Sequence, residues 1–507
     1  MSTAPTAATG GEHSAPRIST VAGTGVEGFA GDNEPAGSAQ LHLPYGVAVD
    51  SVGNVYIADH ANHRVRKVSA DGKISTVAGT GVADFDGDGG QAALAKLNGP
   101  RGLAVDSAGD LYIADSGNRR VRKITMADGN ISTVAGTGSA GSNADGILAT
   151  DARLNDLFGL AVDSGGDLYI ADCHTHRVRK LTRADGKIRT VAGTGAVGSD
   201  VDGIRATDAR LNCPRGVAVD GAGVVYIADA ENHRVRKVAA DGTISTLAGT
   251  GEPDFGGDGG AAKSAQLNGP HAVTVDGAGV VYIADAENHR VRKVAADGTI
   301  STLAGTGEPD FGGDDGPAGS AQLNKPFGLA LNSLDALYIA DHINNRIRKI
   351  ASPRLPKSGT VVCWANARSR LRMAVVREST KDGAEIQQAL PVPRGHQRWR
   401  LVVVGEVGGE ALYRIENVRS GKALEVVGGQ EWPGAVIAQR AYEGGDAHHQ
   451  QWRLIPVDWA ADAPYVYEIA NRSSGLYLRA DTNARTAIRQ DRAEGDDQGR
   501  QWQLLPA

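Results

Sequence analysis

Val55-Tyr56-Ile57-Ala58-Asp59, followed closely by Asn62-His63-Arg64-Val65-Arg66-Lys67-Val68, is a phrase that this chain repeats six times in all. The aspartate that ends the first half recurs every 56 or 57 residues, at Asp59, Asp115, Asp172, Asp229, Asp285 and Asp341. A fixed period of this length indicates an array of one supersecondary unit that cannot bury its apolar face alone.

Each repeat holds four short runs rich in β-branched residues, separated by turn residues. In the first repeat these runs are residues 47–49, 55–58, 64–68 and 74–78. No segment has sustained helical periodicity. The sequence therefore predicts an all-β fold in which six four-stranded units close radially into a six-bladed β-propeller.

The fourth run also indicates how the ring closes. Its Ile-Ser-Thr-Val-Ala pattern begins at Ile18, before the first full repeat, and no copy follows Ile350 in the last one. We therefore expect the N-terminal strand to supply the outer strand of blade six, so that no blade keeps an unpaired edge.

The composition of the chain indicates where the protein is located and which classes of partner are unfavourable. Residues 1–16 lack the basic start and apolar core of a secretory signal, so we expect a disordered tail and a cytoplasmic protein, export by another route remaining open. No run of eighteen apolar residues predicts a membrane span. Charges before residue 358 leave a net of about −7, which disfavours nucleic acid as a partner.

The cysteine count does not indicate a disulfide framework. Cys173 and Cys213 fall in loops of adjacent blades, where they can lie near each other, and Cys363 lies in the second domain. We expect free thiols in a reducing compartment.

A second domain begins where the long period stops. Residues 353–358 read as a linker, and residues 359–507 carry a looser repeat marked by Trp399, Trp452 and Trp502, spaced 53 and 50 residues apart. Three β-rich units with one buried tryptophan each suggest a pseudo-threefold barrel, a β-trefoil.

The phrase Tyr-Ile-Ala-Asp followed by Asn-His-Arg-Val-Arg-Lys resembles the NHL repeat, and residues 17–352 resemble an NHL six-bladed propeller. The long loops, such as residues 251–270, are also similar to those of bacterial members. The repeats depart from the pattern at three positions: Leu157 replaces a proline, Thr175 an asparagine and Asn332 an aspartate.

The Gln-x-Trp triplets make the second domain resemble a ricin-type β-trefoil lectin. That resemblance implies glycan or glycoconjugate binding through an acid, an aromatic platform and a polar residue before the triplet. The acid position carries Ala374, Glu425 and Arg479, so only the second lobe keeps a carboxylate. The resulting carbohydrate-binding candidates are Glu425, Arg440 at the platform position, Tyr442, His449 and Gln450, with Tyr442 or Trp432 as substitute platforms.

The residue after each repeat proline opens an inner strand and should face the mouth of the central channel. These residues are Tyr45, Arg101, Phe158, Arg215, His271 and Phe327. Aromatic rings among cations can form a site for a protein, peptide or small ligand. The alternative is that they plug the channel.

The repeated charged residues read as scaffold. Each repeat aspartate stands five residues before an arginine, as Asp59 stands before Arg64, which suggests an ion pair or a turn cap. The Arg-Val-Arg-Lys strands read as solvated edges. Residues 84–89 imitate an EF-hand loop, but the twelfth position is Ala95, so we expect turn chemistry there.

We therefore predict a non-enzymatic recognition protein without a cofactor. Nucleophile, phosphate and dinucleotide motifs are missing from the sequence, and residues 220–258 repeat as residues 276–314, which suits a scaffold better than one reaction centre. The alternative is a propeller lyase or hydrolase with a metal at the channel, held by His60, Cys173, His174 and His342.

Overall fold

The computed structural model describes residues 16–507, apart from 70, 143, 333–335, 352–359, 367, 368, 370, 392–394, 408, 409, 445, 446, 457–465, 475, 481–486, 493–500 and 507. The chain forms two compact units, Met1–Ser352 and Pro353–Ala507. The expected linker, and the expected tail apart from Pro16, lie outside the described residues.

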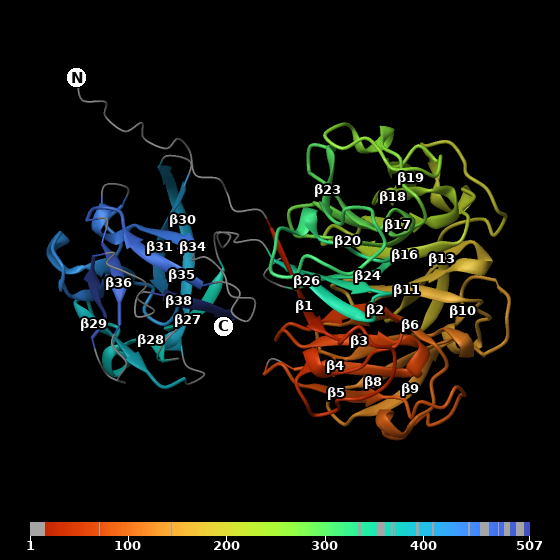
Figure 1. The fold of residues 1–507 in the computed structure, drawn as a ribbon, viewed down its shortest axis with the longest axis horizontal. Helices are drawn as coiled ribbons and strands as arrows, with labels where there is room; N and C mark the ends of the chain where they lie inside the picture. Colours follow the sequence, from red (N-terminus) through yellow and green to blue (C-terminus); the bar gives the residue numbers. More distant parts are fainter. Residues whose placement is uncertain are drawn as a thin grey trace. The chain divides into compact units, whose positions relative to one another are not determined.

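The first unit is the predicted six-bladed propeller (Figure 1). Blades one to three comprise β2 (Pro44–Val49), β3 (Val55–Asp59), β4 (Arg64–Val68), β5 (Ile74–Ala78); β6 (Pro100–Val105), β7 (Leu111–Asp115), β8 (Arg120–Thr125), β9 (Asn130–Ala135); and β11 (Leu157–Val162), β12 (Leu168–Asp172), β13 (Arg177–Thr182), β14 (Lys187–Ala192) with β10 (Ile147–Leu148) at its edge. Blades four to six comprise β16 (Pro214–Val219), β17 (Val225–Asp229), β18 (Arg234–Val238), β19 (Thr243–Ala248) with β15 (Ile204–Arg205) at its edge; β20 (Pro270–Val275), β21 (Val281–Asp285), β22 (Arg290–Val294), β23 (Ile300–Ala304); and β24 (Pro326–Leu331), β25 (Leu337–Asp341), β26 (Arg346–Ala351).

The helices of the described residues are three-residue 3-10 turns, and none of them is long enough to cross a membrane. They are η1 (Ala36–Ser38), η2 (His60–Asn62), η3 (Ala92–Leu94), η4 (Ser116–Asn118), η5 (Ala149–Asp151), η6 (Cys173–Thr175), η7 (Ala206–Asp208), η8 (Ala230–Asn232), η9 (Ala262–Ser264), η10 (Ala286–Asn288), η11 (Ala318–Ser320), η12 (Val376–Glu378), η13 (Gly395–Gln397), η14 (Val427–Gly429) and η15 (His448–Gln450).

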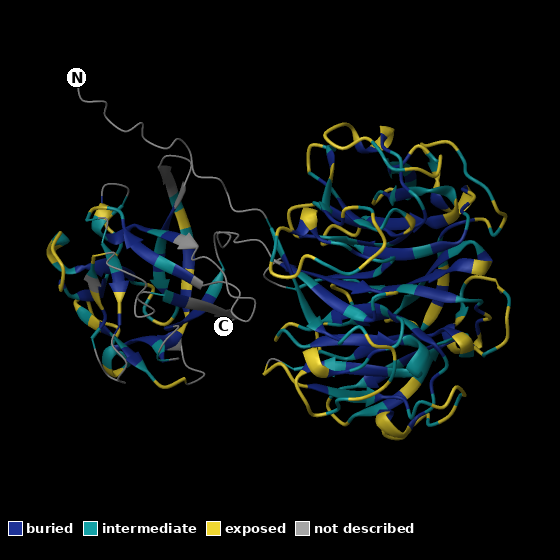
Figure 2. Ribbon diagram, in the orientation of Figure 1, coloured by how far each residue is buried: buried dark blue, intermediate teal, exposed yellow. Residues whose placement is uncertain are grey.

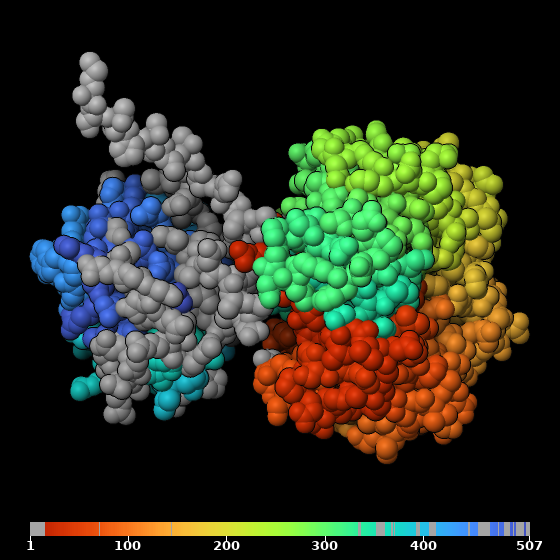
Figure 3. Space-filling view, viewed as in Figure 1, coloured from red at the N-terminus to blue at the C-terminus, as the bar shows by residue number. Residues whose placement is uncertain are grey.

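The N-terminal strand closes the ring as predicted. Strand β1 (Arg17–Ala22) pairs antiparallel with β26, in the register Ile18↔Ile350. The inner strands β2 and β24 also contact each other, so the first and sixth blades lie side by side, red against cyan-green in Figure 3. Strands fill the buried interior and loops form most of the exposed surface (Figure 2).

Small residues let the inner strands approach one another. A Cβ on Gly46 would lie 2.1 Å from the carbonyl oxygen of Arg101, and one on Gly102 would lie 2.0 Å from that of Phe158. Neither distance is possible for a real side chain, so the channel is narrow because its walls meet backbone to backbone.

A buried arginine holds each blade together, and it corrects the predicted pairing. Asp59 accepts hydrogen bonds from the His42 amide (2.8 Å) and the Asn62 side chain (2.8 Å), which confirms turn capping. Its ion-pair partner is the fully buried Arg66, at 3.5 Å, and not Arg64. Arg66 also binds Asp32 of the preceding long loop at 2.7 Å.

The same network accounts for the EF-hand-like loop. Asp88 pairs with the buried Arg122 at 2.7 Å, and Asp84 pairs with Lys96 at 3.0 Å. The expectation that the Arg-Val-Arg-Lys strands are solvated edges is wrong for the second arginine of each, because Arg66, Arg122 and their equivalents are completely buried.

The repeat histidine links neighbouring blades. His63, His176, His233 and His289 have left-handed backbones, and the Nδ1 of each accepts an amide N–H from the loop that enters the next blade. In blade six the Oδ1 of Asn345 accepts from the Leu43 amide in the same way, at 2.8 Å.

The second unit is a β-trefoil-like barrel. Its strands are β27 (Val361–Asn366), β28 (Arg372–Val375), β29 (Ala384–Ala389), β30 (Trp399–Val407), β31 (Glu410–Asn417), β32 (Ala423–Val426), β33 (Ile437–Arg440), β34 (Trp452–Pro456), β35 (Val466–Asn471), β36 (Tyr477–Arg479), β37 (Arg489–Asp491) and β38 (Gln501–Pro506). The first and last strands, β27 and β38, pair with each other.

The three triplet tryptophans are core residues, as predicted. Trp399, Trp452 and Trp502 are completely buried. Their indole N–H groups donate to the carbonyl oxygens of Met373, Leu424 and Leu478 respectively. Each acceptor directly precedes the acid position of its lobe, so the tryptophan fixes that position in all three lobes.

Candidate functional site

The six predicted mouth residues do come together. The ring of Tyr45 lies 5.5 Å from that of His271, 5.7 Å from Phe158 and 4.9 Å from Phe327. His271 stacks on Phe327 at 3.8 Å with an interplanar angle of 12°. Rings from blades one, three, five and six therefore pack across the channel.

A defined hydrogen-bond chain runs through the cluster. Arg215 contacts the Nε2 of His271 at 2.9 Å, and because a guanidinium can only donate, this nitrogen accepts. Burial, followed by the charge of Arg215, holds the pKa of His271 well below its usual range, so the ring is neutral with its proton on Nδ1. That proton is donated to the Tyr45 oxygen, 3.1 Å away.

Two cations flank Phe158. The guanidinium carbon of Arg101 lies 4.1 Å from the ring centroid and that of Arg215 lies 5.6 Å from it. Arg101 pairs with Asp156 at 2.6 Å, and Arg215 pairs with Glu231 at 2.6 Å. The Nε atoms of both arginines are buried without a hydrogen-bond partner among the described residues.

Little space remains inside the channel. The cavity lined by Tyr45, Phe158, Arg215, His271, Phe327 and the residues that follow each of them measures about 60 Å³. This is room for a few water molecules. The packing therefore supports the interpretation that these side chains plug the channel. A ligand would have to bind on the outer face of the cluster.

Two histidines that the sequence suggested only as metal ligands belong to this cluster. His60 and His342 lie 5.6 and 5.5 Å from Tyr45 by ring centroid. Their Nδ1 atoms bond the carbonyl oxygens of Pro100 and Pro44. Burial lowers the pKa of each to about 4. Their place directly after the repeat aspartate was the signal available in the sequence.

The predicted free thiols are wrong for two of the three cysteines. Cys173 and Cys213 form a disulfide that links blade three to the loop entering blade four, while Cys363 is free and buried. The loops of adjacent blades meet, as the sequence allowed, and the expectation failed because the low cysteine count was taken to indicate a reducing compartment.

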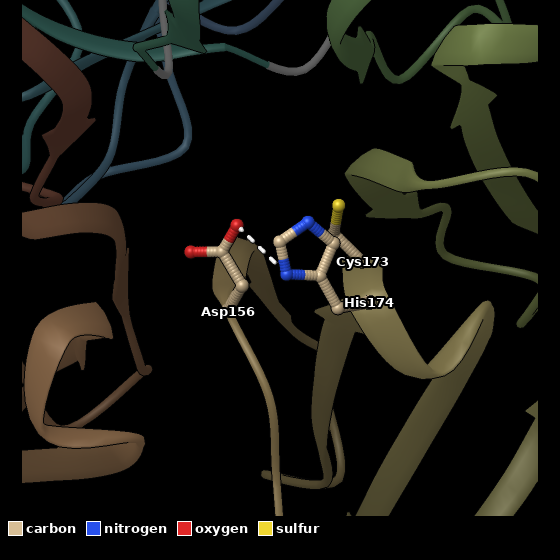
Figure 4. A group of neighbouring side chains, drawn as sticks. All are labelled: Asp156, Cys173 and His174. Carbon is tan, nitrogen blue, oxygen red and sulfur yellow. Dashed lines mark ion pairs between the residues drawn. The ribbon is translucent and has the colours of Figure 1, made fainter. Parts of the chain in front are cut away.

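This disulfide also bears on metal binding. Asp156, Cys173 and His174 lie close enough to suggest a metal site (Figure 4). However, the Cys173 sulfur is used in the disulfide, and Asp156 already pairs with Arg101 and approaches His174 at 3.6 Å. The trio does not fit a metal ion, because a thiolate ligand is missing.

In the trefoil, the second lobe gathers four of its five predicted residues. The carboxylate of Glu425 is 1% exposed, and its Oε1 accepts from Arg440 at 2.9 Å. Its Oε2 lies 3.4 Å from the Gln450 amide nitrogen and 3.7 Å from the Nε2 of His449. The contacts of Tyr442 are with Arg414 and Gln451 instead. Trp432 is 59% exposed.

The third lobe carries the same pair with its charges exchanged. Arg479 occupies the acid position and binds Asp491, at the platform position, at 2.5 Å. In the first lobe the two positions hold Ala374 and Ala389. Among the three acid positions, only that of the second lobe holds a carboxylate, Glu425; in the first lobe a carboxylate from a different position, Glu378, lies 3.8 Å from His396.

Comparison with known proteins agrees with both folds. The model of the ricin-type beta-trefoil lectin domain-like family matches residues 354–440 and 395–488. The NHL repeat model matches residues 41–68 and 155–181, and the teneurin NHL domain model matches residues 81–144, 196–254 and 249–311. The chain thus contains NHL repeats in a propeller and a ricin-B-like domain.

Individual relatives share only parts of their length with this chain. It is 29% identical over 334 residues to the Arabidopsis thaliana protein SUPPRESSOR OF QUENCHING 1, chloroplastic, covering 63% of this chain and 31% of that protein. It is 29% identical over 341 residues to human NHL repeat-containing protein 2, covering 61% of this chain and 46% of that protein. A solved structure of unknown function from Bacteroides thetaiotaomicron is 20% identical with a TM-score of 0.50, covering 66% of this chain and 76% of that one, which shows the fold alone.

Proposed function

We propose that this protein is a non-enzymatic recognition protein whose trefoil binds a glycan or glycoconjugate through its second lobe. The observation that carries the proposal is the convergence of Glu425, His449 and Gln450 in a domain that matches ricin-type lectins. The side chains of Arg440 and His449 are 43% and 24% exposed and can hydrogen-bond to sugar hydroxyls, while the buried Glu425 carboxylate holds both in place.

A glycan array tests this proposal. Binding by the whole chain should be lost in Glu425→Gln, which keeps the shape of the side chain but removes its charge. Arg479→Gln in the third lobe is the matched control and should bind like the parent. Equal binding by all three proteins would remove the second-lobe site, and failure of the parent to bind any glycan would remove the lectin function.

We further propose that the outer face of the mouth cluster binds a protein, peptide or small ligand that carries a hydrogen-bond acceptor. His271 donates to the Tyr45 oxygen, so the Tyr45 proton stays available, since the described residues offer it no acceptor. Asp156 and Glu231 already pair with the nearby Arg101 and Arg215, so the hydroxyl of Tyr45 is the donor left for a ligand. A carbonyl group suits it. Tyr45→Phe should weaken a ligand found by screening, and unchanged affinity would contradict this site.

The disulfide supports a location other than the predicted cytoplasm. Disulfides persist in oxidising compartments and are rare in the cytosol. We therefore propose that the protein functions where Cys173 and Cys213 stay oxidised. Mass spectrometry of protein from its native source, alkylated before reduction, tests this. Alkylated Cys173 and Cys213 would restore the cytoplasmic prediction.

A further inference from the structure

An aromatic ring packs on two arginines in four of the six blades. Each ring comes from the long loop that enters the blade and lies 3.6–3.8 Å from the guanidinium carbon of the first arginine and 4.7–4.8 Å from that of the second. The four rings are Phe29, Phe85, Phe255 and Phe311. Guanidinium groups are attracted to such ring faces.

Blade four lacks this ring, although its arginines have the same sequence around them as those of blade five. Ser199 occupies the position of Phe255. The loops that enter the two blades otherwise keep the same anchoring bond. Asn232 donates to the Gly198 carbonyl at 2.7 Å, just as Asn288 donates to the Asp254 carbonyl at 2.8 Å.

A surface depression of about 350 Å³ lies beside Ser199, the residue at the ring's sequence position, and beside the first arginine of the blade, Arg234. Ser199, Asp200, Val201, Asp202, Arg234 and Thr246 line it. Val201 is 75% exposed and offers an apolar edge, while the hydroxyl of Ser199 accepts from Arg234.

The second arginine beside the depression is poorly bonded. Arg236 is completely buried, yet it reaches Asp202 only at 3.4 Å, whereas Arg292 of blade five reaches Asp258 at 2.7 Å. The Nη1 of Arg236 has no hydrogen-bond partner among the described residues, whereas that of Arg292 donates to Asp285 and to the Gln266 carbonyl; the Nε is unpartnered in both arginines. Arg236 is therefore held by fewer bonds than Arg292 in the blade whose entering loop lacks the ring.

We propose that the depression beside Ser199 in blade four is a binding site for an uncharged aromatic ring, supplied by a phenylalanine-like side chain of a partner polypeptide or by a free aromatic molecule. The ring would take the place that Phe255 takes in blade five. Asp200 and Asp202 in the lining disfavour an aromatic anion, and Arg234 favours a π face.

Titration of the whole chain, followed by NMR or calorimetry, tests this site. The probes are N-acetylphenylalanine amide for the polypeptide source, phenol for the free aromatic source, and N-acetylleucine amide as the apolar control. We expect saturable binding of at least one aromatic probe, about tenfold tighter than the leucine probe.

Two reciprocal variants locate the binding. Ser199→Phe should fill the depression and abolish binding, and Phe255→Ser should open an equivalent second site in blade five. The circular dichroism spectrum of each variant checks its fold. Binding that survives Ser199→Phe, equal binding of the leucine probe, or no saturation by either aromatic probe at millimolar concentration would each overturn the proposal.

Discussion

Blades four and five are built from the same sequence but are not equally complete. Residues 220–258 repeat as residues 276–314, yet Arg292 binds both Asp258 and Asp285, whereas Arg236 reaches Asp202 and the Asp200 carbonyl only at 3.4 Å. The difference lies in the loops that enter the two blades. How many bonds the buried arginine of a blade makes therefore depends on the long loop that enters the blade from its neighbour as much as on the blade's own strands.

The three trefoil lobes also share a scaffold and differ at a few positions. Their tryptophan core is the same three times, while the site positions hold two alanines, a Glu425–Arg440 pair and an Arg479–Asp491 pair. Repeated residues build the scaffold in both units. The positions at which the repeats differ are where recognition is proposed.

The largest expected effect is on the free energy of unfolding, and it should differ between Arg292 and Arg236. Arg292→Met leaves the buried Asp285 without its cation and should lower the free energy of unfolding by roughly 3–5 kcal/mol. Arg236→Met should cost clearly less, since Arg236 contributes fewer bonds. Chemical denaturation of both variants gives the comparison, and equal losses would contradict it.

The disulfide should matter next, because it joins blade three to the loop that enters the incomplete blade. Replacing Cys173 and Cys213 together by serine should lower stability by about 2–4 kcal/mol. Cys363→Ser is the control for loss of a buried thiol. A double variant as stable as the parent under non-reducing conditions would show that the bond is not structural.

The aromatic ring should have a smaller effect. Phe255→Ser exposes Arg290 and Arg292 and should lower the melting temperature, and Ser199→Phe should raise it, each change corresponding to roughly 1 kcal/mol. Scanning calorimetry measures both. Destabilisation by Ser199→Phe would mean that the two loops do not present their side chains alike.

The blade-linking histidines should give a modest pH dependence. Burial lowers the pKa of His63, His176, His233 and His289, so the unfolded chain binds more protons than the folded one. The contribution of these histidines to stability should be complete above about pH 6.5 and fall as the pH drops towards their lower folded-state pKa values, opposite in sign to that of the buried repeat aspartates, whose pKa values burial raises.

Changing His233 to Asn tests the origin of this dependence. Asn345 performs the same task in blade six without titrating in this range, so His233→Asn should keep the link and weaken the pH dependence. Thermal unfolding between pH 4 and pH 7 measures it. An unchanged slope in the variant would assign the dependence to other groups.

The fold followed from the sequence because a repeated phrase gives the period, the strands and the missing last strand. The sequence did not reveal that Asp59 pairs with Arg66, because Arg66 lies diagonally across the strand pair. Arg64 lies directly opposite Asp59, but it is held by the Thr80 carbonyl and Phe29.

The candidate sites were predicted in part. The mouth cluster followed from one position per blade. The acid positions of the trefoil followed from the triplets, and the closeness of Cys173 and Cys213 from the ring, but their oxidation did not, because three cysteines indicated a reducing compartment. The depression beside Ser199 did not follow either, since it depends on how a loop folds.

The most direct test of the central claim is amide hydrogen exchange of β18 and β22, whose sequences and flanks are identical, so that their intrinsic exchange rates agree. NMR is required, because the two strands give peptides of equal mass. If the entering loop determines how complete a blade is, the amides of β18 exchange faster than those of β22. Equal protection in the two strands would contradict the claim.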